Sequence, residues 1–390
     1  MTKLDFIFLG LRMWVTGMVR KVSPQQYSGS AAEICEQIVD DCFDKKRGYF
    51  STSITTYKEM WSRDFGRCAP ALVQTGFGDR VEQTYEFALR AYEREGGFAL
   101  TVLPNGNLYN FPFRTYSPDG FAFFVYGMCS IDGSPLIKKY RPFIEKEAKR
   151  FAETVINRET GLVKEHRHFS EARDYVKRNS STYSNSISYL LQQSLNKLDI
   201  SNPLEKYDYP NLLADNFYNP NTKVFFDDIN KQPYISGDAN ILPFWTGAMS
   251  QLGQNGYARY GDISFENSVN ILDIEGLNTP YPTLYGRGKS GPPSIRLDWI
   301  NPWQHNTVWT CLGIHLLETM SLYMPKRVDD ELLKYKNMIE NLKAFPEVLN
   351  VGTGDYYSNF FYKSETGMLW ASNILALLKN PTGFRHTHRS

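Results

Sequence analysis

The sequence has no surplus of charge of either sign. It contains 43 Lys and Arg and 42 Asp and Glu among 390 residues, which gives a formal net charge of +1. Proteins that bind nucleic acid or anionic membranes electrostatically carry a clear positive excess on one face. The balance of charges therefore argues against nucleic acid and against a membrane surface as partners.

Long apolar runs are also missing. The most apolar stretch, residues 6–19, is interrupted by Gly10 and Arg12 and is shorter than the roughly 20 residues that cross a bilayer as a helix. No small-residue cleavage site follows it. We expect residues 1–27 to form an N-terminal arm that packs on the body of a cytoplasmic protein. A signal anchor is the alternative.

Cysteine is scarce, and its spacing fits no metal site. The five cysteines are scattered, and Cys35 and Cys42 lie two helical turns apart on an apolar face. His166 and His168 have no third ligand close by in the sequence. We expect buried, reduced thiols, as is common in the cytoplasm, and neither a metal ion nor another cofactor.

The chain lacks a Pro/Ser-rich linker and a repeat of fixed period, so neither two linked domains nor a solenoid is indicated. Apolar residues at helical spacing predict about ten to twelve helices. The clearest cover residues 31–42, 81–92 and 187–195. Asp330 is expected to cap another helix that buries Leu333, Met338, Ile339 and Leu342. Further helices are predicted to begin near Asp119, Pro142, Leu204, Asp238, Gln304 and Thr366.

Strand-like segments are few and short. Residues 49–57 alternate weakly and are read as a hairpin, and the Pro- and Gly-rich residues 278–300 are read as a loop that covers or builds a site. This pattern predicts an all-α (α/α)6 toroid with long loops and minor β-hairpins at the cleft end. Residues 28–380 would form its single catalytic domain and residues 381–390 a tail. A helical bundle with a small appendage is the alternative.

Aromatic residues are abundant, at 15% of the chain. Large rings with polar tips pack a core and can also line a wet cleft. Sugars present C–H faces that stack on such rings and hydroxyls that require hydrogen bonds. The composition is therefore compatible with a carbohydrate site and equally with an aromatic-rich core.

Two polar clusters stand at predicted helix starts. The first is Trp61-Ser62-Arg63-Asp64-Phe65-Gly66, in which adjacent Arg and Asp side chains can donate to one sugar hydroxyl and accept from its neighbour. The second places Asp119 after Pro118, where it could serve the same sugar. A structural ion pair at Arg63–Asp64 and a plain helix cap at Asp119 are the competing interpretations.

A third cluster holds two candidates for a general acid. Glu171 and Asp174 share the segment Glu171-Ala172-Arg173-Asp174-Tyr175, ahead of the polar helix start Ser180–Asn185. A general acid requires a carboxyl group in partly desolvated surroundings, so that it stays protonated until it is needed. A surface ion pair with Arg173 is the competing interpretation.

Two more clusters lie near the C-terminus. Trp303, His305, Asn306 and Trp309 precede an amphipathic helix and could stack on a sugar and orient its hydroxyls. Glu347, in Phe345-Pro346-Glu347-Val348, lies between an apolar pair and a glycine-rich turn. This placement is unlike that of a solvated surface residue and suits a base that holds a water molecule. Asp355 and Glu365 are the alternatives for the base.

Taken in order, these clusters resemble the six-hairpin toroid glycosidases, a group that includes glucoamylases, processing α-glucosidases with their mannosylglycerate hydrolase relatives, and alkaline/neutral invertases. Trp61-Ser62-Arg63-Asp64-Phe65 resembles the segment that grips the non-reducing sugar. His305-Asn306-Thr307-Val308-Trp309 resembles the group's His-Asn element, although the usual glycine run is absent. Phe345-Pro346-Glu347 resembles the turn that carries the general base, and residues 366–372 resemble the closing helix. The resemblance covers roughly residues 30 to 380.

The resemblance implies roles for these residues. In the group, the acid lies about eight to ten residues before a polar helix start, and this spacing favours Asp174 over Glu171. Arg63, Asp64 and Asp119 would hold the terminal sugar, with Trp61, Trp303 and Trp309 as stacking surfaces and His305 and Asn306 as hydroxyl contacts.

The expected activity is inverting, exo-acting hydrolysis of a small glycoside or oligosaccharide, with α-linked glucose or a related hexose as the favoured sugar. Glu347 would be the base and Asp174 the acid, and an inverting pair holds its carboxyl groups about 6.5–9.5 Å apart. An inverting disaccharide phosphorylase and a non-hydrolytic sugar-binding or epimerase toroid are the alternatives.

Overall fold

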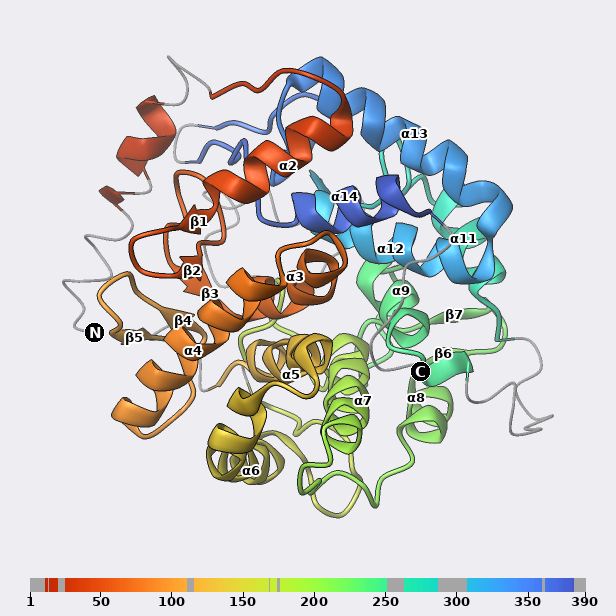
Figure 1. The fold of residues 1–390 in the computed structure, drawn as a ribbon. Helices are drawn as coiled ribbons and strands as arrows, with labels where there is room; N and C mark the ends of the chain where they lie inside the picture. The colour runs from red at the N-terminus through yellow and green to blue at the C-terminus, as the bar shows by residue number, and fades with distance from the viewer. Residues whose placement is uncertain are drawn as a thin grey trace.

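The computed structural model describes residues 11–12, 14–19, 25–110, 116–167, 169–173, 176–250, 263–286, 307–359 and 362–381. Within these ranges the chain forms a ring of six inner helices surrounded by outer helices (Figure 1). The inner helices are α3 (Ser62–Gln74), α5 (Pro118–Met128), α7 (Thr182–Lys197), α9 (Gly237–Trp245), α12 (Thr310–Tyr323) and α14 (Ala371–Lys379). The outer helices are α2 (Ala31–Asp41), α4 (Gly78–Glu95), α6 (Pro135–Val155), α8 (Tyr209–Phe217), α11 (Phe265–Ile274) and α13 (Pro325–Leu342).

The inner and outer helices differ in how much of their surface is buried. Every residue of α5 and α9 is buried, whereas α4, α6 and α13 bury one face and expose the other. A helix that is apolar all round needs neighbours on every side, and a helix with one apolar stripe suits the outside of a ring. The distribution of apolar residues along each helix therefore determines whether it takes an inner or an outer position.

The inner ring is closed. Each inner helix packs against the next, and α14 returns to pack against α3. The outer layer closes as well, since α2 contacts α13 and α14. At this seam the Tyr27 backbone N–H donates to the Lys343 carbonyl at 2.8 Å and the Ala31 N–H to the Glu340 carboxylate at 3.0 Å. Figure 1 shows the red α2 lying beside the blue α13 and α14.

The strands are short and lie in the connections. Antiparallel pairing joins β1 to β2, β3 to β4, β4 to β5, β6 to β7, and β8 to β9. Their bounds are β1 (Phe43–Asp44), β2 (Tyr49–Phe50), β3 (Met60–Trp61), β4 (Thr101–Val102), β5 (Leu108–Tyr109), β6 (Tyr218–Asn219), β7 (Val224–Phe225), β8 (Thr307–Trp309) and β9 (Val348–Asn350). Two of them, β3 and β8, lead directly into the inner helices α3 and α12.

Several helix predictions are confirmed. The patterns at residues 31–42, 81–92 and 187–195 correspond to α2, α4 and α7, and helices begin beside Asp119 and Asp238. Ser30 and Glu33 form a capping box that fixes the start of α2. All five cysteines are buried and free of disulfides. No helix in the described ranges has the length and apolarity that a bilayer crossing requires.

Other predicted starts are wrong. The helix assigned to Asp330 begins at Pro325, whose lack of an N–H suits a first turn. Leu333 is therefore 51% exposed, while Leu332 and Tyr335 are buried in its place. Pro142 lies inside α6, no helix begins at Leu204, and α14 starts at Ala371, not at Thr366. The first hairpin covers residues 43–50, not 49–57. Gln304 lies outside the described residues.

Candidate active site

The six inner helices begin at the same end of the ring. Contacts between their first residues show this, because Arg63 of α3 pairs with Asp119 of α5, and Asp119 accepts from Tyr183 of α7. Asp64 of α3 accepts from Trp370, which caps α14. The remaining two inner helices, α9 and α12, are joined by Tyr285. The Tyr285 carbonyl accepts from the Gly237 N–H of α9, and the Tyr285 ring packs against Trp309, which precedes α12. Helix N-termini carry partial positive charge, so this end favours oxygen-rich groups.

Asp119 is the centre of the first cluster. It is fully buried and lies 2.7 Å from Arg63 Nε, measured to Oδ2. The same oxygen accepts a hydrogen bond from the Tyr183 hydroxyl at 3.0 Å, and Oδ1 accepts from Ser117 Oγ at 2.9 Å. Ser117, not Asp119, caps α5. The plain-cap interpretation of Asp119 is therefore wrong, and the structure brings Arg63 and Asp119 together as the sequence suggested.

Asp64 belongs to a neighbouring cluster. Its Oδ1 accepts from Trp370 Nε1 at 2.8 Å, and Arg67 Nη2 lies 3.6 Å away. The Arg67 guanidinium stacks over the Trp370 ring at 4.8 Å from the ring centroid. Asp64 is 8% exposed. The first two turns of α3 thus carry two buried arginines, Arg63 in contact with Asp119 and Arg67 stacked on Trp370.

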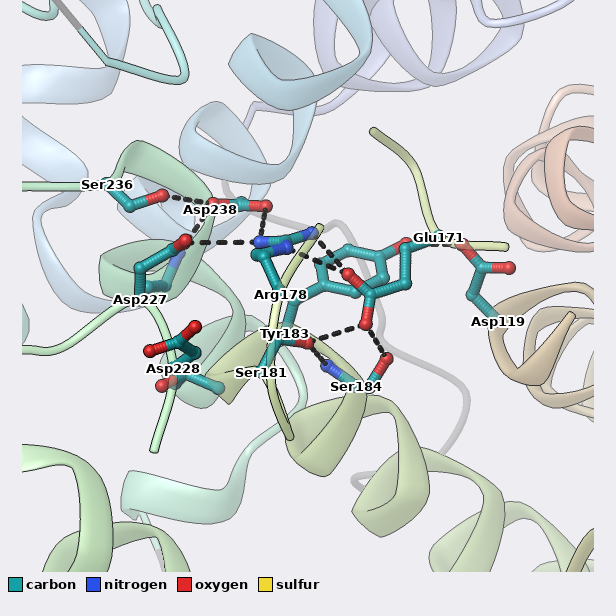
Figure 2. Close-up of polar contacts among 12 residues, drawn as sticks. Asp119, Glu171, Arg178, Ser181, Tyr183, Ser184, Asp227, Asp228, Ser236 and Asp238 are labelled. Atoms are coloured by element: carbon teal, nitrogen blue, oxygen red, sulfur yellow. Dashed lines mark hydrogen bonds and ion pairs between the residues drawn. The ribbon is translucent and has the colours of Figure 1, made fainter. Parts of the chain in front are cut away.

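A third cluster surrounds Arg178 (Figure 2). Three carboxylates contact its guanidinium, with N···O distances of 2.7 Å to Glu171, 3.2 Å to Asp227 and 2.7 Å to Asp238. Burial raises the pKa of Asp238, but the positive charges of Arg178 and Arg173 outweigh this effect and lower it below its usual value. Burial also raises the pKa of Asp228, which lies at the edge of the cluster.

Glu171 is held entirely within this cluster. Its Oε1 accepts from Ser181 Oγ at 2.7 Å and from Ser184 Oγ at 2.5 Å, while Oε2 accepts from Arg178 Nε at 2.8 Å. Both carboxylate oxygens of Glu171 are therefore occupied by contacts within the cluster.

Glu347 lies in the turn before β9. It is 6% exposed, and its two carboxylate oxygens accept from two tyrosine hydroxyls, Oε1 from Tyr57 at 3.1 Å and Oε2 from Tyr362 at 2.5 Å. Its carbonyl accepts from the Thr310 N–H at 3.3 Å, which fixes the turn to the start of α12. The Tyr57 ring packs edge-on against Trp61 at 6.1 Å. Glu347 is thereby connected to the first turns of both α3 and α12.

Only some of the candidate site residues from the sequence lie within the described ranges. Trp61 and Trp309 stand at the starts of α3 and α12, as expected for walls of a cleft. The predicted acid Asp174 lies outside the described residues, as do Trp303, His305 and Asn306.

The two alternative bases are poorly placed. Asp355 is exposed in a turn. Glu365 is fully buried, and one of its oxygens accepts from Ser53 Oγ, Thr55 Oγ and the Thr56 N–H. It therefore acts as a structural clamp between two loops. Across the described ranges, no group of three or more His, Cys, Asp or Glu side chains is arranged to hold a metal ion.

Sequence reasoning missed several residues of this region. Arg67, Arg178 and Asp227 were not singled out, and Tyr57 and Tyr362 were not linked to Glu347. Asp238 was noted only as a helix start. Some of them could have been found from the ionisable residues just before or inside the inner helices. An ionisable residue in an otherwise apolar first turn is seldom solvated, so it is expected to have a buried partner.

No protein-family model matches this sequence, and no curated protein matches it. The structure, however, is similar to solved glycosidases. A rhamnosidase from Klebsiella oxytoca with rhamnose bound matches with a TM-score of 0.61 at 10% identity, over 92% of this chain and 66% of that chain. A glucoamylase of Hormoconis resinae matches with 0.62 at 12% identity, over 91% and 73%.

A third structure, described as a wild-type glycosidase, matches with a TM-score of 0.61 at 10% identity, over 91% of this chain and 97% of that chain. The chain spans about two thirds of the length of the rhamnosidase. At such low identity the similarity establishes the fold. The predicted all-α (α/α)6 toroid is therefore confirmed, and the chain has the six-hairpin architecture found in these glycosidases.

Proposed function

We propose that this protein is a glycoside hydrolase that acts by inversion, from the chain end, on a small glycoside or oligosaccharide of α-linked glucose or a related hexose. The observation that carries the proposal is Glu347. A nearly buried carboxylate with a tyrosine hydroxyl on each oxygen, beside the end of the ring where all six inner helices begin, is suited to bind and polarise one water molecule.

In the proposed reaction, Glu347 removes a proton from water while the water oxygen attacks the anomeric carbon. Asp174 donates a proton to the glycosidic oxygen, the carbon–oxygen bond breaks, and the sugar leaves with inverted configuration. Asp174 keeps this role because both carboxylate oxygens of its rival Glu171 are occupied by contacts with Arg178 and two serines.

The sugar in the reacting position would be held at the starts of the inner helices. Arg63, Asp64 and Asp119 are the proposed contacts to its hydroxyls, and Trp61 and Trp309 are the proposed stacking surfaces. Trp303, His305 and Asn306 complete the set inferred from the sequence. The similar Klebsiella rhamnosidase has rhamnose bound, which supports a sugar of this size as the ligand.

The test is hydrolysis of a panel of disaccharides and aryl glycosides, followed as released reducing sugar. The wild-type protein is compared with Glu347→Gln and with Asp355→Asn, which changes an exposed carboxylate of the same region. We expect Glu347→Gln to lower kcat by about 10²- to 10⁴-fold, the usual contribution of a general base. Asp355→Asn should leave the rate unchanged.

The stereochemistry is read separately. The anomer formed first, observed by NMR before mutarotation, should be the inverted one. Retention would contradict the mechanism, and an unchanged rate in Glu347→Gln would remove Glu347 from it. Turnover that requires phosphate and yields a sugar phosphate would identify a phosphorylase in place of a hydrolase.

A further inference from the structure

Arg173 is a buried cation whose hydrogen-bonding capacity is only partly used within the described part of the chain. It is 2% exposed, and its Nε and Nη1 atoms are buried with no acceptor among the described residues. Its guanidinium lies over the Tyr285 ring, 5.0 Å from the ring centroid. Burying donor groups without acceptors destabilises a folded protein, so such groups usually meet an oxygen that binds there.

The other arginines at this end of the ring are better satisfied. Arg178 contacts three carboxylates and Arg63 contacts Asp119. Arg67 resembles Arg173, since it is 5% exposed and its Nε and Nη2 have no hydrogen-bond partner in the described part of the chain. The 3.6 Å between Arg67 Nη2 and Asp64 Oδ1 is too long for a hydrogen bond.

Tyr285 and Cys311 lie between these two arginines, since the Cys311 thiol contacts both Arg67 and Tyr285 and the Arg173 guanidinium lies over the Tyr285 ring. Burial raises the pKa of the Cys311 thiol, while the neighbouring Arg67 guanidinium and a contact with Tyr285 act against this rise. Burial also raises the pKa of Tyr285 well above its usual value, and both Arg173 and Arg67 oppose that increase. Arg67, Cys311, Tyr285 and Arg173 are therefore neighbours, beside Trp309 at the start of α12.

We propose that Arg173, together with Arg67, forms a binding subsite in which their unsatisfied N–H groups donate to hydroxyl oxygens of an uncharged sugar. This inference rests on the proposed function and deepens it, because it assigns Arg173 and Arg67 to sugar binding and excludes uronic acids as substrates. Two forked guanidinium groups offer several donors to adjacent hydroxyls, which a single lysine could not do.

The charges nearby explain why the ligand is neutral. Arg178 and Arg173 together carry two positive charges against the three carboxylates of Glu171, Asp227 and Asp238, which leaves one negative charge in excess. Arg173 is the second cation that acts on Asp238. A uronic acid would add another carboxylate to this excess, whereas a hydroxyl accepts from Arg173 without adding charge.

The test separates binding from turnover. Binding of D-glucose, L-rhamnose and D-glucuronate is measured by calorimetry and saturation-transfer NMR on the wild type and on Arg173→Met, Arg173→Lys and Arg178→Met. We expect a neutral sugar to bind the wild type better than D-glucuronate. Arg173→Met and Arg173→Lys should each weaken that binding at least about 10-fold, as for the loss of a charged donor.

Thermal unfolding distinguishes a binding residue from a structural one. Arg178→Met should lower the melting temperature clearly, because it leaves three buried carboxylates uncompensated. Arg173→Met should lower it much less, because Arg173 Nε and Nη1 donate to no acceptor among the described residues and Arg173 acts on Asp238 only as a second cation. Equal losses in the two variants would overturn the inference, as would wild-type binding by Arg173→Lys.

Four further results would also support or overturn the inference. Tighter binding of D-glucuronate than of D-glucose, or no binding of either neutral sugar, would overturn the inference. Sugar binding that depends on Arg173, without any hydrolysis of the glycoside panel, would support the subsite and remove the proposed hydrolase. Hydrolysis that is unaffected by Arg173→Met would keep the hydrolase and remove the subsite.

Discussion

Buried polar side chains at the starts of the inner helices find partners far away in the chain. Trp370 donates to Asp64 across 306 positions, and Tyr57 donates to Glu347 across 290. The sequence motifs identified Asp64, Arg63, Asp119 and Glu347 as individuals, because each stands at a helix start or an apolar turn. Their partners could not be predicted, since a hydrogen bond between such distant positions depends on how the ring closes and leaves no local pattern.

The two tyrosines on Glu347 should set the pH dependence of the reaction. Each phenol stabilises the ionised carboxylate that a general base requires. In Tyr362→Phe the protonated form becomes easier to populate, so the acidic limb of the kcat/KM profile should move to higher pH. The pH profile of purified wild type and variant measures this.

Tyr356→Phe is the matched control. Its hydroxyl donates to the Leu342 carbonyl at 3.1 Å, so this variant loses a hydrogen bond of the same region that does not involve Glu347. The acidic limb should stay in place in Tyr356→Phe. A shift of equal size in both variants would show that Tyr362 acts through stability and not through Glu347.

At the scale of helices and strands, amphipathic outer helices were the easiest to predict. α2 and α4 have a regular apolar stripe, and their patterns gave nearly correct bounds. The inner helix α12, which begins at Thr310, is buried almost all round, so it lacks the polar stripe from which periodicity locates a helix. The strands β8 and β9 have only three residues each and pair across about 40 positions, which no alternation in the sequence reveals.

Close packing of α3 against α5 depends on two glycines. A Cβ atom added at Gly66 would lie 2.2 Å from the Phe123 carbonyl oxygen, and one added at Gly127 would lie 2.4 Å from the Gly66 carbonyl oxygen. Gly66→Ala should therefore separate these helices and lower the free energy of unfolding by about 2–3 kcal/mol. Urea denaturation followed by circular dichroism measures the loss.

Gly78→Ala provides the comparison for this variant. Gly78 begins α4, and a Cβ there would meet nothing within 4 Å. Alanine at this site restricts the unfolded chain without a clash, so stability should rise by about 0.4–1 kcal/mol. Equal effects of the two substitutions would show that the α3–α5 contact is not limited by backbone approach.

At the scale of the whole molecule, a buried polar cluster around Glu318 joins several inner helices of the closed ring. Glu318 of α12 is fully buried and accepts from Trp245 Nε1 of α9 at 2.6 Å and from Asn373 Nδ2 of α14 at 2.8 Å. It joins three of the six inner helices. Burial raises the pKa of Glu318 to about 7, although its two hydrogen-bond donors oppose the rise. The neighbouring His315 is also buried, and burial holds its pKa well below its usual value.

Stability should therefore depend on the charge of Glu318. Its pKa is higher in the folded state than in the unfolded state, so its contribution is complete below about pH 4.5 and is lost as pH rises through about 7. Between pH 5 and pH 8 the wild type should lose about 2–3 kcal/mol relative to Glu318→Gln, which cannot ionise. Urea unfolding of both proteins at the two pH values tests this, and a difference that stays constant with pH would contradict it.

Closure of the ring has a consequence for the order in which the protein becomes functional during synthesis. The first inner helix, α3, depends on the last, α14, through the hydrogen bond from Trp370 to Asp64 and the stacking of Arg67 on Trp370. A nascent chain that emerges from the ribosome with five inner helices therefore still exposes the apolar flank of α3. The end of the ring that carries Asp64 and Arg67 is therefore complete only after α14 has been synthesised.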